Sequence, residues 1–517
     1  MKLAAIDLGT NSFHAVIVEV KPSGRFEVID REKDMVRLGD SSLASGRLSD
    51  PAFRRGLRAL RKYQRIVANH RVERTLAVAT SAIREAANGA EFLERVARET
   101  GFRPRVISGE EEGRLVYLAA LHSVHLPDRA LVVDIGGGSV EMVLGSGSRV
   151  ERVVSGKVGC LRLTQRFVRS DPLSPADEAH LVAQVAATLG EAAADVRRRG
   201  FDRLVGTSGT VLAVGALALA EMGRRPRGAL HHQVVSREAV HRVRRRLVES
   251  DLRERRHLPG LDPERADVVV AGAVVLDEIL GHTGASELLL CEWALREGVL
   301  LDHIHGRTHP LVPTEPRPDV RRRSVQHLGE RCQFDDVHAR HVASLSLQMF
   351  DGLAGEHRLG PEARGLLEGA ALLHDIGRHL SYPRHHKHSY YLVKNGGLRG
   401  FSPEEIETIA LVARYHRGSR PRRRHRGYRE LPGKARRAVR LLSALLRLAE
   451  ALDRSHRQVV VAVEVVERAR RLSLRCQVRG DAELEKEGAL RHLGLLALEL
   501  GRPLGLTVAA LAAGRVA

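Results

Sequence analysis

Aromatic residues are scarce in this 517-residue chain: they make up 3% of it, and tryptophan occurs once, at Trp293. Proteins that bind single-stranded nucleic acids without sequence preference stack the bases on aromatic side chains. The low aromatic content therefore argues against a single-strand nucleic-acid module, and we expect no specific nucleic-acid partner to account for the formal net charge of +20. The charge instead indicates another polyanion or a general preference for arginine, and composition alone leaves both explanations open.

Cysteine is also rare, with four residues far apart and no Cys-x-x-Cys pair. This spacing indicates neither a zinc knuckle nor a disulfide framework and fits a reducing compartment. No apolar run approaches the roughly 18 residues that a membrane span needs, because Asp277 or Glu221 interrupts the longest candidates. The first residues form a strand-like run and not a signal-peptide pattern, so we expect a cytoplasmic protein with no membrane partner.

Two segments of the first half match each other. Residues 6–12 read Ile-Asp-Leu-Gly-Thr-Asn-Ser, and residues 133–139 read Val-Asp-Ile-Gly-Gly-Gly-Ser. In both, an apolar strand ends in Asp, a glycine-rich turn follows, and the next residues alternate like a returning strand. Glycine lets backbone N–H groups approach a phosphate, the hydroxyl adds a donor, and Asp suits Mg²⁺. One such turn is common in hairpins, but two matched copies indicate facing phosphate loops in duplicated domains.

This organisation is typical of the actin-like (ribonuclease H-like) ATPase superfamily. The segments between the loops agree with it: we expect a helix at about 50–68, a strand at 76–79, a helix from 174 onward and a strand with a glycine-rich turn at 204–210. Strands that alternate with helices predict α/β domains with mixed sheets.

An acidic triplet, Glu110-Glu111-Glu112, precedes an apolar helix. Ser108 is placed as the N-cap, and Glu111 would complete a capping box. Acids in a first turn also suit the helix dipole. These structural roles explain Glu110 and Glu111 but not Glu112, because successive helix residues point about 100° apart and only one of them can face a cleft.

These runs, together with residues 80–86, 206–210, 265–267 and 294–300, resemble the exopolyphosphatase / guanosine pentaphosphate phosphatase (Ppx/GppA) family over most of the chain. The resemblance implies hydrolysis of terminal phosphoanhydrides, from inorganic polyphosphate or from guanosine pentaphosphate (pppGpp), with Mg²⁺ or Mn²⁺. It implies that Glu112 activates water, that Asp134 positions metal and water, and that Asp7 and Glu141 lie near Mg²⁺. The phosphate-binding residues that it implies are Asn11, Ser12, Arg84, Gly136, Gly137, Gly138, Ser139, Ser208 and Gly209.

Other functions remain open on these motifs. The leading prediction is an exopolyphosphatase whose basic second half aids processivity. The same catalytic site could instead prefer pppGpp, and the sequence does not separate the two substrates. An actin-like kinase or ATPase would need an adenosine pocket and a phosphoryl acceptor site, whereas the glutamate-rich helix start suits hydrolysis. A non-enzymatic sensor of these polyanions is a third possibility, against which the presence of Glu112, Asp134 and Arg84 argues.

Histidine is concentrated in the second half. Residues 311–457 hold 12 of the 26 histidines and 28 lysines and arginines against 16 acids. His374-Asp375, with His338 upstream, resembles the HD phosphohydrolase pattern, in which a His, a His-Asp pair and a later Asp bind a divalent metal. The late position holds Glu450, with Asp453 one helical turn on, and two-metal versions place further histidines where His386 and His416 stand. Imidazole together with carboxylate suits Fe, Mn, Zn or Ni. The alternative to a metal site is a vestigial HD fold, in which these histidines only pack between helices or face a polyanion.

In the family that the sequence resembles, this HD-like region serves a substrate channel and dimer formation, which implies a homodimer. The basic run 414–429 is either a solvated loop or a path for a phosphate chain. We expect four parts: actin-like domains at 1–125 and 126–310, an all-α HD-like domain at 311–457 after a proline-rich linker, and a small α+β tail at 458–517.

Overall fold

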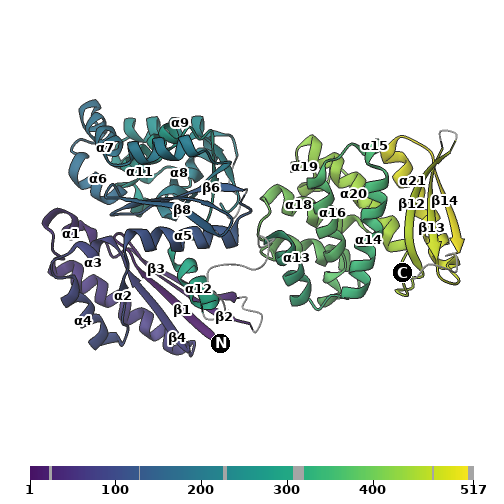
Figure 1. The fold of residues 1–517 in the computed structure, drawn as a ribbon, viewed down its shortest axis with the longest axis horizontal. Coiled ribbons are helices and arrows are strands. Elements are labelled where there is room, and N and C mark those ends of the chain that lie inside the picture. The colour runs from purple at the N-terminus through teal and green to yellow at the C-terminus, as the bar shows by residue number, and fades with distance from the viewer. Residues whose placement is uncertain (22–25, 127, 225–229, 307–319, 469–470, 511–517) are drawn as a thin grey trace. The chain divides into compact units, whose positions relative to one another are not determined.

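The computed structural model describes residues 1–517 except 22–25, 127, 225–229, 307–319, 469–470 and 511–517 (Figure 1). The chain forms two compact units, Met1–Pro318 and Asp319–Ala517, which we call unit 1 and unit 2. The proline-rich linker falls mostly outside the described residues. The finer four-part division of the chain remains a prediction.

Unit 1 contains two sheets of matching topology. The strand orders are β3-β2-β1-β4-β5 and β10-β11-β9-β6-β7-β8. Each sheet begins with an antiparallel meander, β1–β3 or β6–β8, and continues with parallel strands, β4 and β5 or β9 and β11. This repetition confirms the duplicated actin-like fold. The strands are Lys2–Leu8, Phe13–Val20, Phe26–Asp34, Arg74–Ala79, Arg105–Val106, Arg129–Ile135, Val140–Ser146, Arg149–Gly156, Arg203–Thr207, Val234–Ser236 and Glu287–Leu290 for β1 to β11.

The two faces of the first sheet pack against different helices, because successive strand residues point to opposite sides. On β1, Ile6 and Leu8 belong to a core with α2, α3 and α4, whereas Leu3 and Ala5 pack with α5 and α12. These helices are Asp50–Asn69 (α2), Ser81–Glu85 (α3), Gly89–Thr100 (α4), Gly109–Ser123 (α5) and Leu295–Gly306 (α12).

The second sheet repeats this arrangement. On β6, Leu131 and Val133 pack with α7, α8, α9 and α11, whereas Ala130 and Val132 join the same core as α5 and α12. Helices α5 and α12 therefore lie between the two sheets, as Figure 1 shows. The outer helices are Pro175–Arg199 (α7), Ser208–Glu221 (α8), Arg237–Glu249 (α9) and Val269–Thr283 (α11), with the short α10 (Leu252–Arg256) and η1 (Pro263–Arg265) between the last two.

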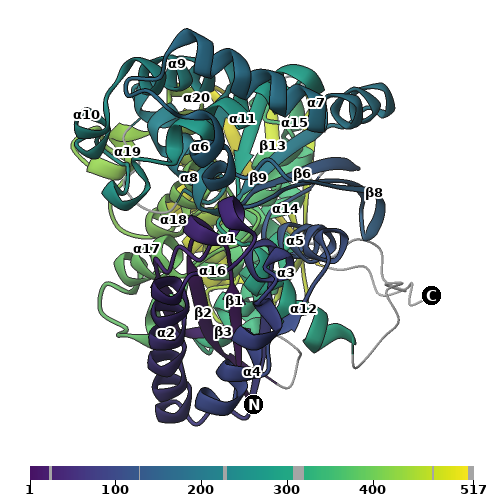
Figure 2. The same ribbon diagram turned by 90° about the vertical axis from the view of Figure 1, so that its left-hand side faces the viewer.

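A second contact joins the halves of unit 1 near the loops. Helix α1 (Gly39–Ser45) packs against α6 (Cys160–Phe167), where Leu161 and Leu43 share a small apolar cluster (Figure 2). Beside it, the Arg37 guanidinium donates two hydrogen bonds, of 2.7 and 3.1 Å, to the Asp267 carboxylate. The two loop-bearing halves are thus connected on both sides of the space between them.

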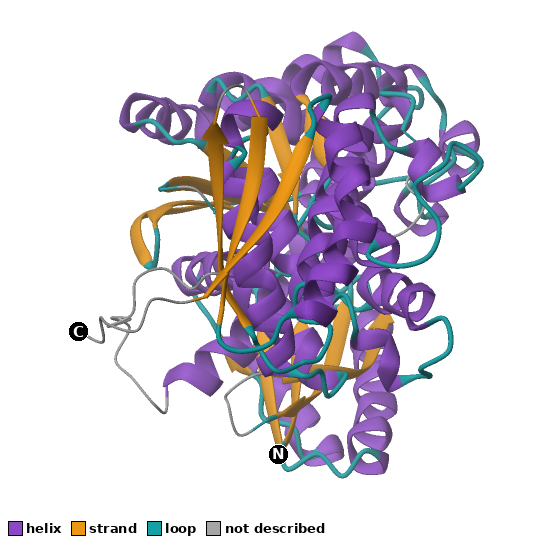
Figure 3. Cartoon of the chain, turned by 90° about the vertical axis from the view of Figure 1, so that its right-hand side faces the viewer, coloured by secondary structure: helices purple, strands orange, loops and turns teal. Residues whose placement is uncertain are grey.

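Unit 2 is a bundle of helices with a three-stranded sheet along one side (Figure 3). Residues of the sheet, such as Leu474 and Cys476, share one core with Leu445 of α20 and Leu496 of α21, so the C-terminal segment packs as part of the bundle. The main helices are Val320–Arg331 (α13), Asp336–Gly352 (α14), Ala354–His357 (α15), Pro361–Leu373 (α16), His385–Asn395 (α17), Pro403–Tyr415 (α18), Arg426–Glu430 (α19), Gly433–Ala451 (α20) and Glu483–Leu500 (α21), with η2 at Ile376–His379. The strands are Val460–Arg468 (β12), Arg471–Val478 (β13) and Leu504–Ala510 (β14).

Among the described residues, no helix combines the length and the apolar character that crossing a membrane requires. The four cysteines are buried free thiols. Cys291 lies in the core between the two sheets, with its thiol 3.3 Å from the Ser123 hydroxyl.

The close approach of α12 to α5 gives a first prediction. A Cβ atom on Gly298 would lie 2.1 Å from the Leu115 carbonyl oxygen, so Gly298→Ala must push the two helices apart. We expect a loss of about 1–3 kcal/mol in the stability of unit 1. Trp293, the one tryptophan, lies in this unit, so its fluorescence during heating reports the unfolding of unit 1.

Gly190→Ala is the matched control, because a Cβ at this helical glycine of α7 meets no atom within 4 Å. Alanine should leave the melting temperature unchanged or raise it slightly. Equal melting temperatures for Gly298→Ala and the wild type would contradict the tight packing of α5 against α12.

Candidate active site

The two glycine-rich loops of unit 1 face each other. A Cβ on Gly137 would lie 3.2 Å from the Cβ atoms of both Thr10 and Asn11, and a Cβ on Gly138 would lie 2.4 Å from the Ser81 hydroxyl oxygen. A side chain at position 138 would therefore force the opposite loop to shift, and one at position 137 would crowd it. The cleft between the loops is lined by Asp7, Gly9, Thr10, Asn11, Ser12, His14, Thr80, Glu112, Asp134, Ile135, Gly136, Gly137, Gly138, Ser139, Cys160, Ser208, Gly209, Thr210, Arg265, Ala294 and Leu295.

Ser12 is oriented by a chain of hydrogen bonds. The Arg296 guanidinium donates to His14 Nδ1 over 3.1 Å, and His14 Nε2 lies 2.8 Å from Ser12 Oγ. Burial and the nearby Arg296 charge lower the pKa of His14 to about 3, so the ring is neutral. Because arginine only donates, the single ring proton is on Nε2 and is donated to Ser12 Oγ. The hydroxyl hydrogen of Ser12 is thereby left for an acceptor in the cleft.

Two acids share the end of the second sheet. Asp134 at the end of β6 pairs with Glu141 on β7, so the two side chains lie on the same face. Glu141 accepts a hydrogen bond of 2.8 Å from Ser155, and it lies behind the residues that line the cleft. Asp7 holds the matching place at the end of β1, and its buried Oδ1 has no hydrogen-bond partner among the described residues.

Helix α5 brings a third acid into the cleft. Ser108 caps the helix, as predicted, and accepts a 3.1 Å bond from the Glu111 backbone N–H. The prediction of a complete capping box is wrong, because the Glu111 carboxylate does not accept from the Ser108 backbone N–H. It accepts two hydrogen bonds of 2.7 Å from Arg105 instead. Glu110 is exposed, whereas Glu112 is 8% exposed and lines the cleft.

Arg84 contacts Glu112. Its guanidinium donates a hydrogen bond of 2.7 Å to the Ile107 carbonyl oxygen and lies 3.4 Å from Glu112 Oε2. Arg84 is not among the residues that line the cleft. Direct phosphate binding by Arg84, which the resemblance implied, stays a prediction.

The buried acids raise one another's pKa values. Burial raises the pKa of Asp7 to about 7, with a further contribution from Asp134. Burial likewise raises the pKa of Asp134 to about 6, and burial together with the Asp134 charge raises that of Glu141 to about 8. The pKa of Glu112 is also raised, by burial and then by Glu141, Asp134 and Asp7, while Arg84 opposes the rise. A cation in this cluster would remove most of this repulsion.

The donor set fits Mg²⁺. All the candidate ligands are carboxylate oxygens, which hard divalent cations prefer, and Asp7 Oδ1 is buried without a partner. Asp7 and Glu141, with Asp134 beside them, would hold the ion.

Arg265 also lines the cleft, although the sequence pattern did not single it out as a site residue. Its guanidinium lies against the backbone of Gly209, where a Cβ would come within 2.2 Å of Nη2. The neighbouring Asp267 is fixed by Arg37. The run 265–267 stood out as a motif, but only the folded chain brings Arg265 to the loops. His14 was missed for the same reason, since its partners Ser12 and Arg296 are far apart in the sequence.

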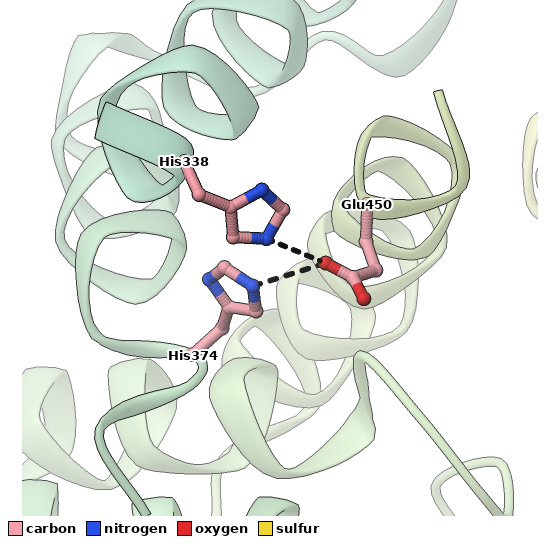
Figure 4. Close-up of side chains that lie close together, drawn as sticks. All are labelled: His338, His374 and Glu450. Atoms are coloured by element: carbon pink, nitrogen blue, oxygen red, sulfur yellow. Dashed lines mark hydrogen bonds and ion pairs between the residues drawn. The ribbon is translucent and has the colours of Figure 1, made fainter. Parts of the chain in front are cut away.

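A second cluster of candidate ligands lies in unit 2. His338 Nε2 and His374 Nε2 lie 3.2 and 3.1 Å from the same oxygen of Glu450, Oε2 (Figure 4). Asp375, His385 and His416 form a neighbouring group, with the two histidine Nε2 atoms 3.1 and 3.6 Å from Asp375 Oδ1. The four predicted metal ligands are therefore brought together in two adjoining groups.

Two details of the prediction for unit 2 change. His385, and not His386, joins His416: Arg384 adopts a left-handed conformation (φ 60°) and α17 begins at His385, which is buried. Asp453 is no ligand in these groups; its Oδ2 lies 2.7 Å from His338 Nδ1 and orients that ring.

Facing phosphate loops and buried acids in a duplicated actin-like fold define a phosphoryl-transfer site. A model of the Ppx/GppA phosphatase family matches residues 16–306, and a model of domain III of that family matches residues 320–499. An exopolyphosphatase from Cytophaga hutchinsonii is 28% identical with a TM-score of 0.56, over 59% of this chain and 98% of that one. A family member from Aquifex aeolicus is 30% identical with a TM-score of 0.52, over 60% and 99%. This chain belongs to the Ppx/GppA phosphatase family, and it is a phosphoanhydride hydrolase.

The buried acids predict a pH-dependent stability. In chelator, the melting temperature of unit 1 should fall as the pH rises from about 5 to about 8.5, because Asp7, Asp134 and Glu141 keep protons that the unfolded chain has already released. Glu141→Gln should flatten this fall and raise the melting temperature at pH 8.5 by at least about 3 °C. Thermal unfolding followed by Trp293 fluorescence in EDTA at several pH values measures this change in melting temperature.

Glu110→Gln, at an exposed position, is the control, and its melting temperature should depend on pH as that of the wild type does. Added Mg²⁺ should raise the melting temperature of the wild type more than that of Glu141→Gln, since binding to the folded state stabilises it. A melting temperature of the wild type that does not change with pH in EDTA would contradict the repulsion within the cluster.

Proposed function

We propose that this protein is an exopolyphosphatase, which hydrolyses the terminal phosphoanhydride bond of inorganic polyphosphate with Mg²⁺ or Mn²⁺. Glu112 acts as the base, and Asp134 positions the water. The loops bind phosphate through Asn11, Ser12, Gly136, Gly137, Gly138, Ser139, Ser208 and Gly209. A cytoplasmic homodimer is the expectation that accompanies this assignment.

The position of Glu112 carries the proposal. It is the acid that α5 brings into the cleft opposite the two loops, it is buried, and its pKa is raised. Water is a poor nucleophile, and a carboxylate whose pKa is raised above its ordinary value accepts a proton from water more readily. A kinase transfers the phosphoryl group to an acceptor of its substrate and does not need a base that activates water.

The reaction follows from these roles. Glu112 takes a proton from water, and the water oxygen attacks the terminal phosphorus. The bond between that phosphorus and the bridging oxygen breaks, orthophosphate forms, and the shortened chain leaves with the bridging oxygen as its new end. Backbone N–H groups of the loops, the Ser12 hydroxyl and Arg265 balance the charge on the equatorial oxygens. Asp7 and Glu141 would hold Mg²⁺, which would neutralise phosphate charge and relieve the repulsion among the acids.

Hydrolysis of pppGpp is the second candidate, because its terminal phosphate presents the same bond. The excess of basic residues in 311–457 favours a long polyanion over a nucleotide. Initial rates on long-chain polyphosphate and on pppGpp, measured with the same preparation, decide between the two. A higher kcat/KM for pppGpp would reverse the assignment.

Removing the base gives the first functional prediction. Glu112→Gln should lower the rate of orthophosphate release from polyphosphate at least about 100-fold, because general base catalysis typically contributes 10²–10⁴-fold. Glu110→Gln changes an exposed glutamate on the same helix turn and should retain the rate of the wild type. Equal rates for Glu112→Gln and the wild type would refute the assignment of the base.

Replacing Arg265 gives the second functional prediction. Arg265→Ala should lower kcat/KM for polyphosphate about 100-fold, because it removes a cation that faces the transferred phosphoryl group. Arg265→Lys should restore part of the loss by keeping the charge. Arg256→Ala, an exposed arginine of the neighbouring α10, is the control. A normal kcat/KM in Arg265→Ala would remove this residue from the site.

A further inference from the structure

The carbonyl oxygens of the second phosphate loop, residues 136–139, are bound by the segment that begins α6. The first backbone N–H groups of a helix have no acceptor within the helix. In α6 these N–H groups donate to the carbonyl oxygens of Gly136 and Gly137, over 3.0 to 3.1 Å. The preceding residue, Gly159, donates to the Gly138 carbonyl oxygen over 3.3 Å. These three carbonyl groups of the loop therefore point toward the start of α6.

The orientation of these carbonyl groups fixes the direction of the N–H groups of the loop. In a trans peptide the N–H and C=O bonds point in opposite directions. The N–H groups of Gly137, Gly138 and Ser139 are therefore turned away from the start of α6, and these residues line the cleft. None of the three N–H groups donates to an acceptor among the described residues. They are available to a phosphate oxygen, because successive backbone N–H groups form anion-binding sites.

The first phosphate loop has the same backbone arrangement. The N–H groups of Arg37 and Gly39 donate hydrogen bonds of 2.8 and 2.9 Å to the carbonyl oxygens of Asn11 and Thr10. These donors come from the segment that begins α1, which follows the first antiparallel meander as α6 follows the second. Both halves of unit 1 thus turn their loops through the backbone. The second loop has an additional side-chain contact.

The Arg162 side chain makes this contact. Its Nε donates a hydrogen bond of 2.8 Å to the Gly138 carbonyl oxygen, and its Nη2 donates one of 2.9 Å to Glu85 Oε1. The same Glu85 oxygen accepts a bond of 2.7 Å from the Ser81 hydroxyl. The side chains of Arg162 and Glu85 are 17% and 22% exposed, so salt screens this ion pair less than a surface pair. The exposed Lys157, 3.0 Å from Glu85 Oε2, adds little.

This contact connects the second loop with the proposed base. Glu85 belongs to α3, in the first half of unit 1, and its neighbour Arg84 lies 3.4 Å from Glu112 Oε2. Helix α3 thus contacts the loop through Glu85 and the acid through Arg84. Hydrolysis requires the water and the terminal phosphorus at a fixed separation, and a displacement of about 1 Å can cost about 100-fold in rate. Contacts that fix the loop relative to Glu112 therefore affect the rate without touching the substrate.

We propose that Arg162 and Glu85 are positioning residues of the hydrolysis: together they hold the second loop with its N–H groups turned toward the terminal phosphate and at a fixed distance from Glu112. Neither residue is among those that line the cleft, so both act through the Gly138 peptide. This inference rests on the proposed binding of phosphate by the loops.

Steady-state rates on long-chain polyphosphate and on pppGpp, well below the melting temperature of each variant, test the role of Arg162. Arg162→Ala should lower kcat/KM at least about tenfold, because the loop loses a bond from a charged donor. Arg162→Lys should restore only part of the loss, since an ammonium group lacks the planar fork that reaches both acceptors. Arg166→Ala, an exposed arginine one turn further along α6, is the control and should keep the kcat/KM of the wild type.

A double-mutant cycle tests whether the two residues act as one unit. Glu85→Ala leaves the bond from Arg162 to Gly138 possible, so it should lower kcat/KM less than Arg162→Ala does. The double variant should lose no more than Arg162→Ala alone, because residues that act through one contact are not additive. Melting curves followed by Trp293 fluorescence accompany each rate, so that a loss of folded protein is not counted as a loss of positioning.

Three results would overturn the proposal: a kcat/KM of Arg162→Ala equal to that of Arg166→Ala, full additivity in the cycle, or a normal or raised kcat/KM in Glu85→Ala beside an impaired Arg162→Ala. The last result would mean that Arg162 leaves Glu85 to bind the phosphate itself. A wild type that hydrolyses only pppGpp would refute the exopolyphosphatase assignment and would still test Arg162, because both substrates present a terminal phosphate to the loop.

Discussion

Four carboxylic side chains that repel one another are buried where the duplicated loops of unit 1 meet, and the surrounding structure holds them there. Asp7 and Asp134 end equivalent strands of the two sheets, Glu141 is paired opposite Asp134, and Glu112 comes from the helix between the sheets. Their raised pKa values measure the cost of this arrangement. In the proposed reaction, a cation would neutralise the acids and the loops would bind the phosphate chain, so that both would offset this cost.

The packing of unit 1 explains how this cluster stays assembled. Helix α5 is enclosed by both sheets and by α12, so its first turn, with Glu112, cannot move independently of the loops. Close contacts at Gly137 and Gly138 fix the loops against each other, and Arg162 binds the Gly138 carbonyl oxygen at 2.8 Å. Gly137 and Gly138 therefore help to set the geometry of the cleft, although they have no side chain that could react.

The sequence predicted the features that depend on local pattern. The repeated strand, Asp, turn and Ser identified the duplicated fold. Helix geometry left Glu112 less well explained than its neighbours, and the family resemblance gave it the role of the base. What it missed depends on contacts between distant segments: Arg265 reaches the loops only through the packing of the second half of unit 1. Spacing likewise could not separate His385 from His386, because the choice depends on the left-handed turn at Arg384. The excess positive charge of 311–457 belongs to the same unit as the histidine groups.

Hydrolysis of long-chain polyphosphate in oxygen-18 water tests the central claim most directly, because it reports which phosphorus the water attacks. In the proposed reaction the water activated by Glu112 attacks the terminal phosphorus held between the loops. Each orthophosphate released should therefore carry one solvent oxygen, and the new end of the shortened chain should carry none. Solvent oxygen in the chain end, or release of unlabelled orthophosphate, would contradict the account.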